Sequence, residues 1–266
     1  MHHRTLLRTV AVAGTLAAVL AACGEDADDG GAALPRGDDA VDLDPDDFTV
    51  AVDHELWPME PGTRWRYREV DEEGRELEVV VTVTSATKAV ANGVTARVLR
   101  DTVTDDGEVV EDTFDWYAQD ADGNVWYLGE DTAELEDGEV TSRDGSFEAG
   151  VDGALPGIIL PAEPAVGMAY RQERYEGEAE DDGAVLALDQ QVEVPAGHFT
   201  GALLTADTDG LEPDVLEYKL YAPGVGPVLA LGISGGAGRE ELLERTTVPD
   251  DVARAAGTVP LGEPYG

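Results

Sequence analysis

Few side chains in this sequence could act as nucleophiles. Its 266 residues include one cysteine, Cys23, and four histidines. The run Gly232-Ile233-Ser234-Gly235-Gly236 has the Gly-x-Ser-x-Gly spacing of a nucleophile elbow. That elbow needs a strand, a sharp turn, a helix and a later histidine. The last histidine of this chain is His198, and no helical pattern follows Ser234. We therefore expect neither a hydrolase nor an enzyme of another kind.

Metal ligands are equally sparse. Beyond the first 22 residues only His54 and His198 remain as nitrogen ligands, which is too few for a usual zinc site. The segment Asp120-Ala121-Asp122-Gly123-Asn124 is similar to a calcium loop, but its glycine comes too early and no glutamate follows at the required distance. Among 57 aspartates and glutamates no pair stands out for acid–base chemistry. We expect no cofactor, and only weak cation binding by clustered carboxylates.

Cys23 offers the clearest chemistry. Arg4 and Arg8 precede the apolar run 9–22, which ends in Leu20-Ala21-Ala22-Cys23. This order is typical of a secretory signal peptide, and the run is shorter than the roughly 20 residues of a membrane-spanning helix. Leu-Ala-Ala-Cys resembles the lipobox of bacterial lipoproteins. The resemblance implies transfer of a diacylglyceryl lipid to the Cys23 thiol, cleavage before it, and an extracytoplasmic protein anchored to the cell membrane. The alternative is an ordinary secreted protein.

The charge of the chain limits its partners. The formal net charge is −40 at pH 7, and removing the two arginines of the signal peptide makes it −42. Nucleic acid and anionic lipid surfaces would both repel such a protein, so we expect no nucleic-acid partner. Contact with the membrane is expected through the lipid on Cys23, because two acyl chains hold more firmly than one. Solubility, cation binding and adaptation to salt are alternative reasons for the acidity.

An acidic segment follows the cysteine. Residues 24–55 contain twelve acidic side chains and one basic side chain, Arg36, with few large apolar residues before Phe48. Such a composition cannot bury enough surface to offset the entropy of ordering, so we expect a disordered, self-repelling tether. The sequence therefore divides into a signal peptide (1–22), a lipid anchor with an acidic tether (23–55), a β domain (56–248) and a C-terminal tail (249–266).

Short alternating runs begin at residue 56. Trp65 and Tyr67 alternate with Arg64, Arg66 and Arg68, as in a strand with one buried and one solvated face. Similar patterns predict further strands at 77–84, 95–103, 109–118, 125–128, near 140, 168–173, 185–194, 199–206, 215–221, 228–233 and 241–246. Tight turns are expected at Asn92-Gly93, Asp106-Gly107, Asp122-Gly123, Asp137-Gly138, Asp144-Gly145, Asp182-Gly183 and Asp209-Gly210. A short helix is expected near 249–256.

Strands joined by short hairpins predict an all-β fold, an antiparallel meander with little helix. Because about ten twisted strands must curl or split into two layers, we expect a curved half-barrel, a barrel or a sandwich. The chain also contains three motifs: Gly-x-x-Trp-x-Tyr within 56–67, Val194-Pro195-Ala196-Gly197-His198-Phe199, and Tyr221-Ala222-Pro223-Gly224-Val225-Gly226. Together they resemble a loose group of uncharacterised exported bacterial lipoproteins. The resemblance implies a curved sheet like that of lipoprotein carriers, although their long helix has no counterpart here.

An aromatic hairpin is the first candidate ligand site. A four-residue turn from Asp120 to Gly123 would place Trp116 on the face of Tyr127, and Tyr117 with Trp126 on the other face. We expect one face to pack in the core. The other is expected to be a partly exposed pair or a platform on which a ligand stacks.

A proline-rich stretch, residues 155–164, is the second candidate. It carries Ile158, Ile159 and Leu160, which could form a lid over a cavity or belong to the core. Two functions follow. The first is a non-catalytic binding module for an apolar or amphipathic ligand. The second is an envelope interaction or scaffold protein without a small-molecule ligand, its concavity filled by its own side chains. The sizes of the inward-facing side chains distinguish the two functions. Binding needs an empty volume surrounded by small side chains, whereas a scaffold has large, interdigitated ones.

Overall fold

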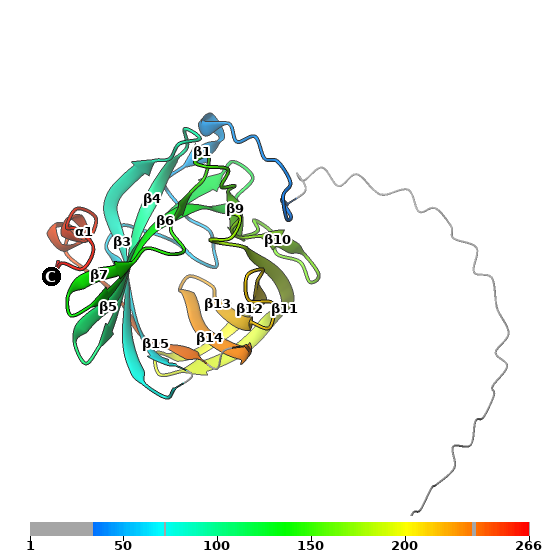
Figure 1. Cartoon of the computed structure of the whole chain (residues 1–266). Coiled ribbons are helices and arrows are strands. Elements are labelled where there is room, and N and C mark those ends of the chain that lie inside the picture. The colour runs from blue at the N-terminus through cyan, green and yellow to red at the C-terminus, as the bar shows by residue number, and fades with distance from the viewer. Residues whose placement is uncertain (1–33, 72, 236–237, 266) are drawn as a thin grey trace, which may run out of the picture. The chain divides into compact units, whose positions relative to one another are not determined.

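Antiparallel strands make up most of the part of the chain that the structure describes (Figure 1). The computed structural model describes residues 34–71, 73–235 and 238–265, so the predicted signal peptide and Cys23 lie outside the described residues. Its elements are η1 (Pro45–Asp47), β1 (Phe48–Thr49), β2 (Thr63–Val70), β3 (Glu76–Ala89), β4 (Thr95–Asp105), β5 (Glu108–Asp120), β6 (Val125–Glu136), β7 (Glu139–Ser142), β8 (Phe147–Glu148), β9 (Gly157–Leu160), β10 (Ala169–Arg171), β11 (Asp181–Val194), β12 (Gly197–Asp209), β13 (Leu216–Ala222), β14 (Gly226–Ser234), β15 (Arg239–Thr247) and α1 (Asp250–Ala256). No helix in these ranges is long and apolar enough to cross a membrane.

The strands follow one another in the sheet almost as they do in the sequence. The order is β10-β11-β12-β13-β14-β15-β2-β3-β4-β5-β6-β7, with β1 paired to β5, and β8 and β9 paired to β6. The sheet curls so that β9 comes near β10 (Figure 1), where Leu155 and Arg174 form an isolated bridge. The predicted all-β meander is confirmed. Its form is a strongly curved sheet that no continuous ladder closes within the described strands.

Alternation along each strand decides which side chains face the interior. In β2, Trp65 and Tyr67 are buried, as their spacing predicts. The alternating arginines of this strand lie on the outer face, where Arg66 forms an ion pair with Glu244 at 2.8 Å. An exposed pair of this kind contributes well below about 1 kcal/mol, whereas each buried aromatic side chain contributes roughly 2–3 kcal/mol. The interior therefore supplies most of the stability of this strand.

Two hairpins have the turns that the sequence predicts. Asp106 and Gly107 connect β4 to β5 with φ values of 49° and 88°. Asp137 and Gly138 connect β6 to β7 with φ values of 52° and 76°. Two successive residues with positive φ form a type I′ turn, whose twist matches that of the flanking strands.

The turn predicted at Asp182-Gly183 is wrong. Both residues lie inside β11, and Gly183 pairs with Tyr170 on one side and Asp207 on the other. A Cβ atom on Gly183 would lie 2.5 Å from Cε2 of Tyr170. Glycine at this position therefore lets the Tyr170 ring lie directly against the backbone of β11. Close approach to the backbone is a reason for glycine within a strand, in addition to its use in turns.

The prediction of a disordered tether is wrong for its second half. Residues 34–55, which we call the N-terminal strap, pack on the sheet, while 23–33 lie outside the described part of the chain. Arg171 of β10 fixes the start of the strap by donating to the carbonyls of Gly37 (2.6 Å) and Asp39 (2.9 Å). Five of its apolar side chains pack against the core and hold it there: Leu34, Val41, Leu43, Phe48 and Val52.

The C-terminal residues also belong to the β unit rather than to a separate tail. Helix α1 forms where the sequence predicts it and lies beside β3 (Figure 1). The following residues, 257–265, pass over the outer face of the sheet. There the guanidinium of Arg100 donates to the carbonyls of Val259 (3.0 Å) and Pro260 (3.1 Å). Arg100 also pairs with Asp112, and both side chains are almost fully buried.

Candidate functional site

Aromatic side chains fill one end of the interior. The ring of Trp57 contacts those of Tyr117 and Tyr221, at centroid distances of 5.4 and 6.1 Å. Tyr117 in turn stacks on Tyr127 at 4.8 Å. All four residues are buried, and we call them the aromatic plug. Tyr117 and Tyr127, predicted as ligand-binding residues, therefore have almost no surface left for a ligand.

The plug corrects the predicted faces of the aromatic hairpin. Its turn holds three residues between Asp120 and Asn124, not four, and a hydrogen bond from Asp120 N to Asn124 O (3.0 Å) closes it. Tyr117 therefore pairs directly with Tyr127. A change of one residue in the register moves a side chain to the opposite face of the sheet. The inner face carries both tyrosines, and the outer face carries Trp116 and Trp126.

Trp126 is covered by the N-terminal strap. Its ring lies 6.1 Å from that of Phe48, and its Nε1 donates to Oδ2 of Asp120 (2.7 Å). Only 7% of the residue is exposed. The predicted ligand-stacking role of Trp126 therefore lacks an open ring face.

The predicted lid is a strand. Ile158, Ile159 and Leu160 form β9, which pairs with β6. Ile158 and Leu160 are fully buried, and Ile159 is partly buried against the core. Of the two alternatives for these residues, a lid or part of the core, the structure has the second. β6 pairs with β7 only near its far end, which leaves backbone groups that β9 satisfies.

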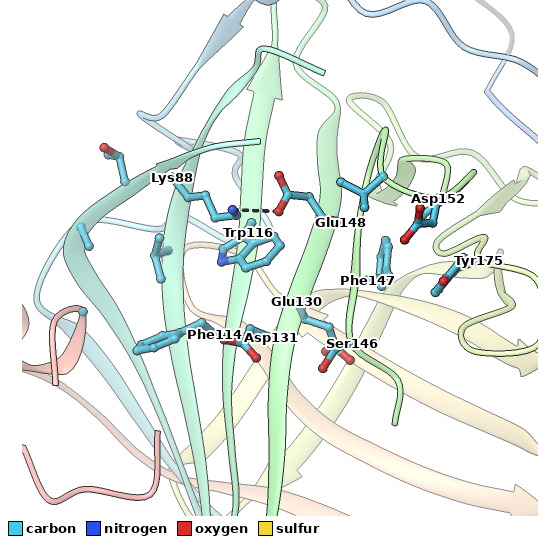
Figure 2. A pocket seen from close by; sticks show the side chains of 16 residues that line it. Lys88, Phe114, Trp116, Glu130, Asp131, Ser146, Phe147, Glu148, Asp152 and Tyr175 are labelled. Atoms are coloured by element: carbon cyan, nitrogen blue, oxygen red, sulfur yellow. Dashed lines mark ion pairs between the residues drawn. The ribbon is translucent and has the colours of Figure 1, made fainter. Parts of the chain in front are cut away.

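Trp116 lies in a pocket beside β6, which we call the edge pocket (Figure 2). The Lys88 ammonium lies 4.4 Å from the centroid of the Trp116 ring and pairs with Glu148 at 2.8 Å. The cavity has a volume of about 630 Å³. Its apolar lining comes from several strands and one loop: Val98, Phe114, Trp116, Phe147, Val151 and Ala154.

Polar groups share the edge pocket with this apolar lining. Figure 2 shows Asp152 and Tyr175 beside Phe147, and Asp131 near Phe114. Among the predicted ligand residues, only Trp116 lines this pocket. Most of the other lining residues come from β3, β4, β5, β6 and β8 and from the segments 149–156 and 172–180, and no single sequence pattern connects these parts of the chain.

Carboxyl groups line the interior next to the plug. The Tyr127 hydroxyl lies 2.7 Å from Oδ1 of Asp115 and 2.8 Å from Oε2 of Glu130. A hydroxyl has one proton to donate, so one of the two carboxyls must carry a proton to complete both hydrogen bonds. Burial raises the pKa of both carboxyls, and the nearby Asp115 charge raises that of Glu130 further. The pair shares protons as a unit.

Towards its other end the interior opens into a cavity of about 670 Å³, which we call the acidic cavity. Aliphatic side chains of β3 and β4 line one part of it: Leu77, Val79 and Val103. Six carboxylates line another part: Glu69, Asp101, Glu111, Glu134, Glu136 and Glu240. Burial raises the pKa of Asp101 well above its usual value. Burial, followed by repulsion from Glu69, raises the pKa of Glu240 to about 8.

The spacing of residues along the strands predicts these inward-facing carboxylates, although the strand predictions above did not identify them. Asp101 lies in β4, two residues from Leu99 and two from Val103. The period of two therefore places its carboxylate on the same face as both apolar side chains. An acidic residue in phase with buried residues predicts an acidic group inside the fold.

The motifs that resemble exported lipoproteins meet at the plug. Nε1 of Trp65 donates to the carbonyl of Val225 (2.7 Å). A Cβ atom on Gly226 would lie 2.7 Å from Cδ1 of Trp57, so a larger residue would displace that ring. The Gly-x-x-Trp-x-Tyr and Tyr-Ala-Pro-Gly-Val-Gly segments therefore build one structural contact.

His54 and Ser234 have structural partners. Nδ1 of His54 accepts from Leu56 N (3.2 Å), which leaves Nε2 to donate to the Pro161 carbonyl (3.0 Å). Burial lowers the pKa of His54 and favours this neutral form. Ser234 ends β14, and its hydroxyl donates to the Asp214 carbonyl (2.9 Å). Over the residues that the structure describes, no three His, Cys, Asp or Glu side chains converge as a metal site.

Comparison with known proteins assigns no family to the chain. No protein-family model and no curated protein matches it. A candidate lipoprotein from Parabacteroides distasonis has a TM-score of 0.38 and 13% identity, over 72% of this chain and 98% of that one. A β-barrel-like protein of unknown function from Brucella abortus has a TM-score of 0.34 and 12% identity, over 70% and 98%. At these low values neither similarity indicates a function.

Proposed function

We propose that this protein is a lipid-anchored extracytoplasmic lipoprotein whose β unit is a non-catalytic binding module for an amphipathic ligand. The sequence ending at Cys23 supports the anchor. The edge pocket supports the binding role, because apolar side chains and a few charged groups line one cavity of about 630 Å³. Ligand sites in proteins commonly have roughly this size and this mixture of groups.

The charges of the edge pocket select the polar part of the ligand. Lys88 is already paired with Glu148, so its charge is neutralised within the pocket. Glu130, Asp131 and Asp152 add further carboxyl groups to the lining. An anionic head group would be repelled, so the ligand has a neutral or positively charged head and an apolar body.

A charge placed in the edge pocket tests this proposal. Val151 lines the pocket and is 40% exposed, whereas Val166 is 64% exposed and lies outside it. Neither change empties a core. Val151→Glu should weaken binding of the neutral fluorescent probe N-phenyl-1-naphthylamine by about tenfold, a loss of about 1.4 kcal/mol, because a charge enters the apolar lining. Val166→Glu should leave the affinity unchanged. Equal titration curves for both variants would contradict the assignment of the pocket.

The anchor has its own test. Cys23→Ser removes the thiol that would carry the lipid, and two acyl chains supply stable membrane attachment. The variant should move from the membrane to the soluble fraction while its melting temperature stays unchanged. Retention in membranes after a high-salt wash would contradict lipid anchoring.

The packed end of the interior favours a second candidate, an envelope interaction or scaffold protein. Trp57, Tyr117 and Tyr221 fill that end with the protein's own side chains, as this function requires. Native mass spectrometry of the protein purified from its host membranes separates the candidates. A co-purifying small molecule supports the binding module. Bare protein that also fails to bind the probe supports the scaffold.

A further inference from the structure

The acidic cavity is separate from the edge pocket and has its own chemistry. Its six carboxylates come from five strands, β2, β4, β5, β6 and β15, with two of them on β6. None of the six forms an ion pair or a side-chain hydrogen bond with another described residue. Neighbouring negative charges raise the free energy of ionising them all together.

Asp101 has a side-chain oxygen without a hydrogen-bond partner among the described residues. Its Oδ1 atom is buried and accepts no hydrogen bond from the described residues. The cross-strand neighbours of Asp101 are Val81 and Thr113, so no basic side chain lies directly beside it. A buried acceptor without a partner costs roughly 1–3 kcal/mol. A cationic donor placed in the cavity would remove that cost.

The same interior already binds an alkylammonium group that belongs to the chain. Nζ of Lys219 lies 3.0 Å from Oδ2 of Asp207 and 3.1 Å from Oε1 of Glu217. Burial alone would lower the pKa of Lys219, but Asp207 and Glu217 outweigh it and keep the amine charged. This pair shows how inward carboxylates of this sheet hold an ammonium. The Lys219 charge also lowers the pKa of Glu240, but Lys219 forms its ion pairs with Asp207 and Glu217 and with none of the described carboxylates of the acidic cavity.

The spacing of the carboxylates determines which kind of cation fits. No three of them converge closely enough to coordinate one metal ion, within the described ranges. A linear chain with several amines can reach carboxylates on different strands. Its methylene groups can then contact the aliphatic side of the cavity: Leu77, Val79 and Val103.

We propose that the acidic cavity binds a linear organic polyamine, with Asp101 and Glu240 as carboxylate partners of its ammonium groups. This site does not depend on the edge pocket or on its amphipathic ligand. A protein with a formal charge of −40 also attracts polycations over its whole surface, so the test must separate the cavity from that general attraction.

Calorimetric titration of the full chain with spermidine makes this separation. The variant Asp101→Asn/Glu240→Gln replaces two ionisable carboxyl groups of the cavity by neutral amides with almost no change of shape. Its control, Glu193→Gln/Glu212→Gln, removes two charges from exposed positions. The cavity variant should weaken spermidine binding by about tenfold or more, while the control changes it by less than about twofold. Thermal melts check that both variants fold.

Two results would overturn the polyamine site. Equal losses in both double variants would mean that spermidine binds by diffuse surface attraction. Displacement of spermidine by Ca²⁺ at equal concentration would mean that the cavity takes a small inorganic cation. A loss confined to the cavity variant, with N-phenyl-1-naphthylamine binding unchanged, would support a polyamine site independent of the edge pocket.

Discussion

The two ends of the interior are built by the same strands yet differ in what fills them. In β2, Trp65 faces the packed end and Glu69 faces the acidic cavity. In β5, Tyr117 likewise faces the packed end and Glu111 faces the acidic cavity. Alternation turns all four side chains inward. Whether the space between them is closed or hollow depends on the volume and charge of the side chains, which alternation does not determine.

The energetic roles of the two ends should therefore have opposite signs. Rings that contact one another at the packed end add dispersion and remove apolar surface from water. Carboxylates at the other end repel one another and resist ionisation. The packed end stabilises the fold, whereas the carboxylates around the acidic cavity lower the free energy of unfolding.

The largest expected effect is at the packed end. Trp65 is fully buried, and its Nε1 donates to the Val225 carbonyl. Trp65→Ala should lower the free energy of unfolding by about 3–5 kcal/mol, since it leaves a cavity and an unpaired carbonyl. Urea denaturation measures the change. Arg66→Ala, on the outer face of the same strand, is the control and should cost less than about 1 kcal/mol. Similar losses would mean that the interior does not dominate stability.

A buried carboxylate with a partner should behave unlike those of the cavity. Asp112 is 1% exposed and pairs with Arg100, which is 0% exposed. Asp112→Ala should cost about 3 kcal/mol, because it leaves the guanidinium buried without its counter-charge. Asp101→Asn, on the neighbouring strand, should cost nothing. Chemical denaturation of the two variants gives the comparison, and a large loss for Asp101→Asn would contradict the view that its charge opposes folding.

The cavity also sets a pH dependence. The pKa of Glu240 is raised to about 8 and that of Asp101 well above normal, so the folded state holds protons that the unfolded state has released. Stability should then fall by roughly 1–2 kcal/mol as the pH rises from 6.5 to about 8. Below pH 6.5 the lowered pKa of His54 acts in the opposite direction. Thermal melts across this range check the sign, and a rising melting temperature would refute it.

The smallest expected effect comes from one cavity carboxylate. Glu240→Gln should raise the free energy of unfolding by about 1 kcal/mol at pH 8, and change it little at pH 5, where folded Glu240 is already protonated. Glu244→Gln, in the same strand but paired with Arg66 outside, should bring no gain at either pH. A gain of equal size from both variants would mean that total charge, not the cavity, is responsible.

Strand positions and tight turns could be predicted from the sequence because they depend on neighbouring residues. The hairpin at Asp106-Gly107 and helix α1 follow from local preferences of this kind. The faces of the aromatic hairpin could not be predicted so well. They depend on one residue of turn length, and an error there exchanges Trp126 with Tyr127 as the partner of Tyr117 on its face of the sheet.

The two pockets depend on contacts that local patterns do not contain. Lys88 and Glu148, which pair beside Trp116, come from β3 and β8, and three strands, β4, β5 and β6, lie between these two in the sheet. The N-terminal strap was missed for a similar reason. Its apolar residues are too few to form a core of their own, but they pack on a surface that the rest of the chain provides.

Arg171 constrains the order in which the chain can assemble. It contacts the Pro156 carbonyl across 15 residues and the Gly37 carbonyl across 134 residues. Closing the longer loop costs about 2 kcal/mol more in chain entropy, from the logarithmic dependence of closure entropy on length. The shorter loop therefore closes first on average, and it joins β10 to the segment leading into β9. The strap comes earliest in the chain, but it docks late in folding, onto a sheet whose edges have already met.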